Sequence, residues 1–198
     1  ALWPNNNNMN VVLDLGANIV CDEKNLLDFS IMGSSLFKSL FNIECPRIAL
    51  LNVGLEEIKG NEILKNTYTI LKNNKLNNFE FKGYIEGNKI MDDGVDVIVT
   101  DGFTGNIALK TAEGTANFIT KNLNKSLNKL SLLFSFIPLK KFKEKLDPRK
   151  YNGAIFLGLE SPVVKSHGST DAFGFAHSIK VCNKIVKASL IEKIKSNL

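Results

Sequence analysis

VDVIVTDGFTGN, residues 95–106, has the pattern of a buried strand that turns directly into a helix. The first six residues form an apolar, β-branched run with one Asp, and Asp101-Gly102 ends that run. Thr104 is a suitable helix cap, and apolar residues at helical spacing continue as far as Ile119. This stretch therefore predicts a strand, a short polar loop and a helix.

The same order of strand, polar loop and helix recurs along the chain. Further strands are expected over residues 10–15, 47–52, 153–159 and 163–164, and further helices over residues 22–41, about 61–71 and from 171 onward. Strands that are apolar on both faces and alternate with helices indicate a mostly parallel sheet covered on each side. The predicted fold is an open, doubly wound α/β/α body that spans residues 1–198.

Composition excludes several classes of protein. A chain of 198 residues with 44% hydrophobic content suits one core. The sequence contains no run of about 18 apolar residues, so no membrane span is expected. The first residues lack a signal-peptide pattern, so a cytosolic protein is expected. The three cysteines stand far apart without a CxxC pair, which predicts buried thiols and neither a disulfide framework nor a metal site.

Charge is concentrated in residues 121–150, where nine basic and two acidic residues give a net charge of +7. Pro138 interrupts this segment beside an apolar tip, so we expect a projecting helical hairpin. The tip could enter lipid headgroups or meet an acidic partner, or it could belong to an ordinary helix pair with its apolar face in the core. The residues proposed for membrane or carrier-protein contact are Leu132, Leu133, Phe134, Phe136, Ile137, Lys140 and Lys141.

Four polar loops follow the predicted strands, at residues 14–18, 53–62, 101–106 and 165–171. In open α/β sheets, ligands bind beyond the carboxyl ends of the strands, and glycines, helix N-termini and lysines suit an anion. No GxGxxG or P-loop motif is present. Each loop alone is more often structural, so the residues by themselves indicate only an α/β domain with an anion site. The candidate substrate-binding residues are Gly16, Asn18, Asn61, Asp101, Gly102, Thr104, Gly105, His167 and Ser169.

Six motifs occur together and in order: DLGAN (14–18), IMGS (31–34), PRIALLNVG (46–54), KGNE (59–62), VTDGFTGNIALKTAEG (99–114) and KSHGSTDA (165–172). Jointly they resemble the PlsX-type phosphate acyltransferases across nearly the whole chain. Members of that family have a further N-terminal portion with glycine-rich loops. We therefore expect this chain to be the C-terminal part of a longer enzyme and a poor catalyst by itself.

The resemblance implies a homodimer, folded like isopropylmalate dehydrogenases and phosphotransacetylases and peripherally associated with membranes. It implies transfer of a fatty acyl group from acyl carrier protein to inorganic phosphate, giving acyl phosphate for phospholipid synthesis without a cofactor beyond the carrier's phosphopantetheine. Lys59 and Asn106 match the family's catalytic positions.

In our hypothesis Lys59 offsets phosphate charge and Asn106 donates to the thioester oxygen, while Gly102 and Gly105 let backbone donors assist. Two other functions remain open. One is a phosphotransacetylase-like transfer from acyl-CoA to phosphate, and the other is a non-catalytic fragment that binds membranes or carrier protein.

Overall fold

A computed structural model describes residues 1–73, 78–126, 153–166, 168 and 170–197 of the chain. Its centre is a five-stranded sheet in which β1 pairs antiparallel with β2 and all other neighbours are parallel. Across the sheet the strands are β1 (Leu2–Pro4), β2 (Met9–Leu13), β5 (Val97–Val99), β3 (Arg47–Asn52) and β4 (Glu80–Glu86). The prediction of a mostly parallel α/β sheet is confirmed.

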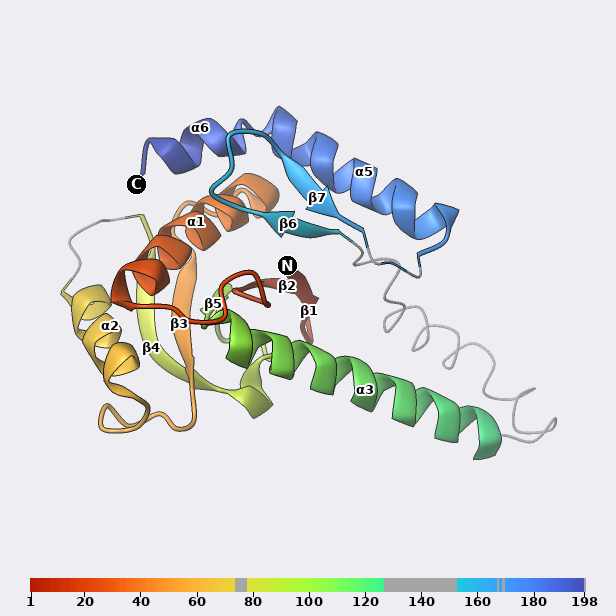
Figure 1. The fold of residues 1–198 in the computed structure, drawn as a ribbon, viewed down its shortest axis with the longest axis horizontal. Helices are drawn as coiled ribbons and strands as arrows, with labels where there is room; N and C mark the ends of the chain where they lie inside the picture. Colours follow the sequence, from red (N-terminus) through yellow and green to blue (C-terminus); the bar gives the residue numbers. More distant parts are fainter. Residues whose placement is uncertain (74–77, 127–152, 167, 169, 198) are drawn as a thin grey trace.

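Helices cover both faces of this sheet (Figure 1). One face carries α1 (Glu23–Phe41), α2 (Glu62–Lys72), α5 (Ala172–Lys187) and α6 (Leu190–Lys195). The opposite face carries α3 (Gly102–Ser126), and a single 3-10 turn, η1, spans Gly87–Lys89. The three-layer α/β/α arrangement predicted from the sequence is therefore present.

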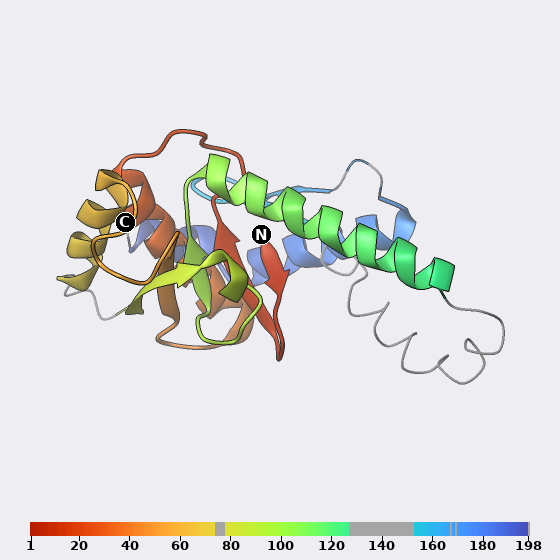
Figure 2. The same cartoon turned by 90° about the horizontal axis from the view of Figure 1, so that it is seen from below.

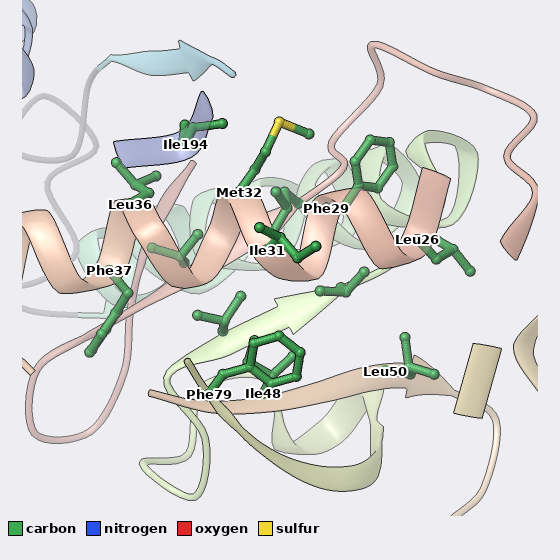
Figure 3. Packing of buried hydrophobic residues seen from close by; sticks show 14 of the residues in the cluster. Leu26, Phe29, Ile31, Met32, Leu36, Phe37, Ile48, Leu50, Phe79 and Ile194 are labelled. Atoms are coloured by element: carbon green, nitrogen blue, oxygen red, sulfur yellow. The ribbon is translucent and has the colours of Figure 1, made fainter. Parts of the chain in front are cut away.

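Alternating side chains of the central strands divide the core in two. Leu13, Leu50 and Val99 point into the layer of α1, whereas neighbouring residues such as Ala49 and Ile98 point toward α3. Figure 3 shows the first layer, in which α1 lays its apolar face over β3. Burying each large side chain contributes roughly 1.5–3 kcal/mol, so this double layer is the main reason that the strand ends stay in place.

Helix α1 is the longest buried element, and its sequence explains where it begins. The Asp22 side chain accepts a hydrogen bond from the Asn25 backbone N–H at 2.8 Å, and the Asn25 side chain accepts one from the Asp22 backbone N–H at 3.0 Å. This reciprocal capping box satisfies two backbone donors at the helix start. Leu36 and Phe37 then pack at 1% and 2% exposure.

The structure corrects the expected strand pattern in three places. Strands β1 and β4 were not predicted from the sequence. The segments expected as a last strand of the sheet instead form a separate antiparallel pair, β6 (Ala154–Phe156) with β7 (Val163–Lys165). Phe156 is 40% exposed, so the apolar run is not buried on both faces as a central strand requires.

The predicted basic hairpin cannot be compared directly. Residues 121–126 continue α3, and residues 127–150 lie outside the described part of the chain. The hairpin and its apolar tip therefore stay predictions. Among the helices that the structure describes, none combines the length and apolarity needed to cross a membrane.

Candidate functional site

Three polar loops begin side by side at one edge of the sheet. Leu13 in β2 lies opposite Val99 in β5, which in turn lies opposite Leu50 in β3. All three strands are parallel, so the loops that follow them leave from the same edge. Adjacent strands are about 4.8 Å apart, which places the three loop starts within roughly 10 Å. The expected adjacency of the strands that precede Lys59 and Asn106 is confirmed.

Asp14 organises the first of these loops. Its Oδ1 accepts from the backbone N–H groups of Gly16 at 2.9 Å and Ala17 at 3.0 Å. Its Oδ2 accepts from the Asn18 backbone N–H at 2.6 Å and the Asn18 Nδ2 at 2.9 Å. Burial raises the pKa of Asp14, but the hydrogen bonds lower it by more, so the pKa lies below its ordinary value of 3.8.

Asn106 is attached to this loop from the first turns of α3. Its Nδ2 donates to the carbonyl oxygen of Leu15 at 2.9 Å. Gly16 packs directly against the same amide, and a Cβ at position 16 would overlap Asn106 Nδ2. Gly16 also has a φ of +121°, a backbone angle that residues other than glycine rarely adopt. The two site residues predicted in separate motifs, Gly16 and Asn106, are therefore in contact.

Gly102 and Gly105 allow α3 to approach the same loop closely. A Cβ on Gly105 would overlap the carbonyl oxygen of Asp14, and one on Gly102 would lie 2.5 Å from the carbonyl oxygen of Asn18. The Gly102 N–H donates to Asn18 at 2.8 Å, and the Gly105 N–H donates to Asp101 at 3.0 Å. The N–H groups of Gly102 and Gly105 are thus both engaged within the protein, and the assistance of backbone donors near these glycines stays a prediction.

Asp101, rather than Thr104, caps α3. The Asp101 carboxylate accepts from the Thr104 backbone N–H at 2.8 Å and from the Thr104 hydroxyl at 2.7 Å. The helix already begins at Gly102, so Thr104 lies three residues after the cap. The sequence pattern placed the cap too late because Asp and Thr are both good capping residues and only their geometry separates them.

Lys59 lies in the loop after β3, and hydrogen bonds from Asn52 and from α2 restrain this loop. The buried Asn52 side chain donates from Nδ2 to the Lys59 carbonyl at 3.2 Å. Glu57 accepts from Lys72 Nζ and from the Tyr68 hydroxyl, each at 2.8 Å, which ties the loop to α2. With Glu57 bound in this way, Lys59 makes no ion pair with any residue that the structure describes, and it is exposed.

Asn61 closes that loop as the cap of α2. Its Oδ1 accepts from the Leu64 backbone N–H at 2.9 Å. This contact accounts for its place in the motif without a substrate. A role for Asn61 in binding stays a prediction, as it does for Gly16, Asn18 and Thr104.

Two of the predicted substrate-binding residues, His167 and Ser169, fall outside the described residues. Two others of importance were not predicted, namely Asp14 and Asn52. An Asp directly before a glycine-containing turn is a common organiser of such turns, so the sequence held a usable signal for Asp14. Asn52 has no comparable signal, because its partner is a backbone carbonyl seven residues away.

The cysteines are all free, but only Cys21 is buried; Cys45 is exposed and Cys182 is half-buried. The expectation of three buried thiols was therefore wrong for two of them. Cys45 lies in the exposed turn between α1 and β3. Burial raises the pKa of Cys21, which opposes formation of a nucleophilic thiolate there. Within the described ranges no group of three or more His, Cys, Asp or Glu side chains could hold a metal ion.

Exposed apolar side chains occur on the same segments as these polar groups. They come from the loops after β2 and β3 and from the start of α3. Val20, Val53 and Ile58 are the most exposed, at 87%, 80% and 80%. We call the full set the apolar rim: Ile19, Val20, Val53, Leu55, Ile58, Phe103 and Ile107.

Comparison with known proteins gives consistent matches. A sequence profile described as fatty acid synthesis protein matches residues 1–193. A protein of Pelagibacter ubique named Phosphate acyltransferase is 64% identical over 203 residues, covering 100% of this chain and 61% of that protein. Proteins of the same name from Sinorhizobium fredii and Afipia carboxidovorans are 44% and 46% identical, covering 100% and 98% of this chain and 58% and 56% of their own length. The chain thus spans about three-fifths of the relatives it matches.

Proposed function

The chain belongs to the family of fatty acid synthesis proteins. We propose that it contributes Lys59 and Asn106 to the catalytic site of a phosphate acyltransferase. The observation that carries the proposal is the meeting of three strand-end loops at one edge, in a chain 64% identical to a protein named Phosphate acyltransferase. The proposed reaction moves a fatty acyl group from acyl carrier protein to inorganic phosphate. The product is an acyl phosphate for phospholipid synthesis.

The proposed chemistry needs no covalent enzyme intermediate. A phosphate oxygen attacks the thioester carbonyl carbon, the C–S bond breaks, and the carrier thiolate leaves and takes up a proton. Phosphate is already a nucleophile near neutral pH, and a thiolate leaves readily, so positioning and charge stabilisation can supply the rate. No cofactor beyond the phosphopantetheine of the carrier is proposed.

Lys59 and Asn106 have separate roles in this scheme. The exposed Lys59 ammonium offsets phosphate charge at the end of β3, two strands away from β2. The Asn106 amide donates one N–H to the Leu15 carbonyl oxygen. Its second N–H can donate to the thioester carbonyl oxygen of the substrate. A donor held in place before the reaction is worth more than one that must be oriented during it.

The apolar rim favours a fatty acyl donor over an acetyl group. Seven large apolar side chains on two loops and the start of α3 are exposed, a surface that an acetyl group would leave uncovered. A long acyl chain would bury part of this rim and gain about 0.8 kcal/mol per buried CH₂. The rim therefore supports a long-chain acyl donor rather than acetyl-CoA.

The decisive assay uses a hybrid protein. In the Pelagibacter ubique relative, the matching segment is replaced by these 198 residues, and acyl phosphate is trapped with hydroxylamine as the hydroxamate. We expect phosphate-dependent product with acyl carrier protein as donor and less with acetyl-CoA. A folded hybrid that makes no acyl phosphate, beside an active unmodified relative, would refute the proposal.

We further propose a homodimer that associates peripherally with anionic membranes through residues 121–150. Basic residues near an anionic surface each contribute about 1 kcal/mol of attraction, and this segment has a net charge of +7. In vesicle sedimentation, the Phe134→Asp and Phe136→Asp double variant should lose binding to anionic vesicles, and Phe118→Asp on α3 serves as the control. Unchanged sedimentation of the double variant would contradict the membrane proposal.

A further inference from the structure

The hydrogen bonds of Asp14 hold its loop in one conformation. Four N–H groups converge on one buried carboxylate within 2.6–3.0 Å. Hydrogen bonds to an ionised acceptor are roughly twice as strong as neutral ones, so this side chain outweighs any single backbone contact in the loop. Gly16, Ala17 and Asn18 therefore take their places around Asp14.

That conformation determines the direction of one carbonyl group. Leu15 lies between Asp14 and Gly16. The hydrogen bond from the Gly16 N–H to the Asp14 carboxylate joins these two neighbours and so restrains Leu15. The Leu15 carbonyl oxygen is the acceptor for Asn106 Nδ2 at 2.9 Å. Because the carboxamide is planar, the bond made by one N–H sets the direction of the other.

Helix α3 is fastened to the same loop by independent contacts. The Gly102 N–H donates to the Asn18 carbonyl at 2.8 Å, and the backbone of Gly105 abuts the Asp14 carbonyl. These contacts place the backbone of Asn106, and the Leu15 carbonyl then orients its side chain. Backbone placement and side-chain orientation thus depend on one five-residue loop.

We propose that Asp14 is a positioning residue, whose carboxylate directs the Leu15 carbonyl and through it the Asn106 amide. The proposal rests on the proposed function insofar as Asn106 acts on the reacting carbonyl oxygen. Asp14 itself is bound to loop N–H groups and touches no reacting atom in this scheme. Its effect on catalysis is therefore indirect and should appear in kcat rather than in phosphate binding.

The first arm of the test measures Asn106 directly in the 198-residue chain. The two side-chain N–H signals of Asn106 are identified by NMR from their loss in Asn106→Ala. Asp14→Asn puts an amide where two of the donors now bind, so we expect both signals to shift and the protected proton to exchange faster. Asp22→Asn is the matched control, because it removes the same charge nearby while its side chain caps α1.

A second variant keeps the test decisive if Asp14→Asn does not fold. Asn18→Ala removes only the Nδ2 donor to Asp14 and leaves the three backbone donors. It should change the Asn106 signals in the same direction and by less. Unchanged signals in folded Asp14→Asn, or in folded Asn18→Ala when the first variant is unfolded, would overturn the proposal.

The second arm measures turnover of the hybrid protein carrying Asp14→Asn. Misplacing a reacting group by about 1 Å can cost around 100-fold, so we expect kcat to fall roughly 10- to 100-fold while KM for phosphate changes less than about threefold. An equal loss in the Asp22→Asn control would overturn the positioning role. If the Asn106 signals respond as expected but the unsubstituted hybrid makes no acyl phosphate, the proposed function fails and the positioning of Asn106 stands.

Discussion

Asn106 lies at the start of α3 and is hydrogen-bonded to the loop after β2, whereas Lys59 is exposed in the loop after β3. Replacing each with Ala should therefore have different effects. Asn106 is held by the Leu15 carbonyl, and losing that bond costs about 1 kcal/mol of stability. Losing one oriented donor to an oxyanion costs about 100- to 1,000-fold in turnover, or roughly 3–4 kcal/mol. In the hybrid, Asn106→Ala should show this loss in kcat while remaining folded. Asn122→Ala on the exposed part of α3 is the control and should keep full turnover.

Lys59→Ala should be at least as severe and should also weaken the dependence on phosphate. The exposed ammonium has no ion-pair partner among the described residues, so its removal should leave the unfolding midpoint almost unchanged. Lys65→Ala on α2, which removes a lysine that pairs with Glu62 at 3.1 Å, is the control for turnover. If both residues serve one transition state, the double variant will be much less impaired than the product of the single losses. Near-normal rates for both single variants at saturating phosphate would end the assignment.

Asp14 predicts a pH dependence whose sign follows from its hydrogen bonds. Burial raises its pKa and the loop donors lower it by more, so the folded pKa is below 3.8. The stabilisation is complete above the unfolded pKa and is lost as the pH falls through the folded one. The difference in unfolding free energy between the wild type and Asp14→Asn should therefore shrink below about pH 4. Denaturant unfolding across this range measures it, and a difference independent of pH would contradict the assignment.

At the scale of elements, α3 depends on its contact with the loop after β2. Its far half runs past the strands in both views (Figures 1 and 2), so the packing near Gly105 is a principal anchor. Gly105→Ala would push a methyl group into the Asp14 carbonyl. Overpacking of this kind costs about 1–3 kcal/mol or more, and rigid backbone cannot yield easily.

Gly114 offers a matched control within the same helix. Nothing lies within 4 Å of a Cβ added there, so Gly114→Ala should stabilise the protein by about 0.5–1 kcal/mol through helix propensity. Thermal unfolding should thus move in opposite directions for the two substitutions. If Gly105→Ala were neutral or stabilising, the close approach of α3 to the loop would be wrong.

The elements differ in how far the sequence could predict them. Helix α1 and the central strands were found because long apolar periodicity and continuous apolar runs reflect burial directly. Strand β4 was missed because its first four residues are exposed or half-buried and include Gly83. The β6 and β7 segments were assigned to the wrong sheet, because an apolar run does not specify its pairing partner. The loops after β2 and β3 were located correctly, whereas residues 102–106 are already helical and the segment 165–171 follows β7, outside the five-stranded sheet. The hydrogen bonds of Asp14 and Asn52 needed three-dimensional structure.

At the scale of the whole molecule, polar contacts and exposed apolar side chains occur together at one edge of the sheet. The polar contacts lie where the strands end, and the apolar rim lies on two loops and the start of α3, segments that are far apart in the sequence. A fatty acyl chain on this surface would place its reactive thioester beside the polar groups and its tail along the rim. This arrangement predicts that rim residues govern the acyl donor and leave phosphate unaffected.

Val20 and Leu55 test that prediction, because they are 87% and 61% exposed on two different loops. Replacing both with Asn in the hybrid removes apolar contact without opening a cavity, so folding should be unchanged. Each large apolar side chain contributes up to about 1.5–3 kcal/mol when fully covered, and partial cover predicts a rise in KM for long acyl donors of roughly 10-fold. KM for phosphate should stay the same. Val186→Asn on α5, which is 56% exposed across the sheet from α3, is the control and should alter neither constant. An unchanged KM for the long-chain donor in the double variant would show that the acyl chain lies elsewhere.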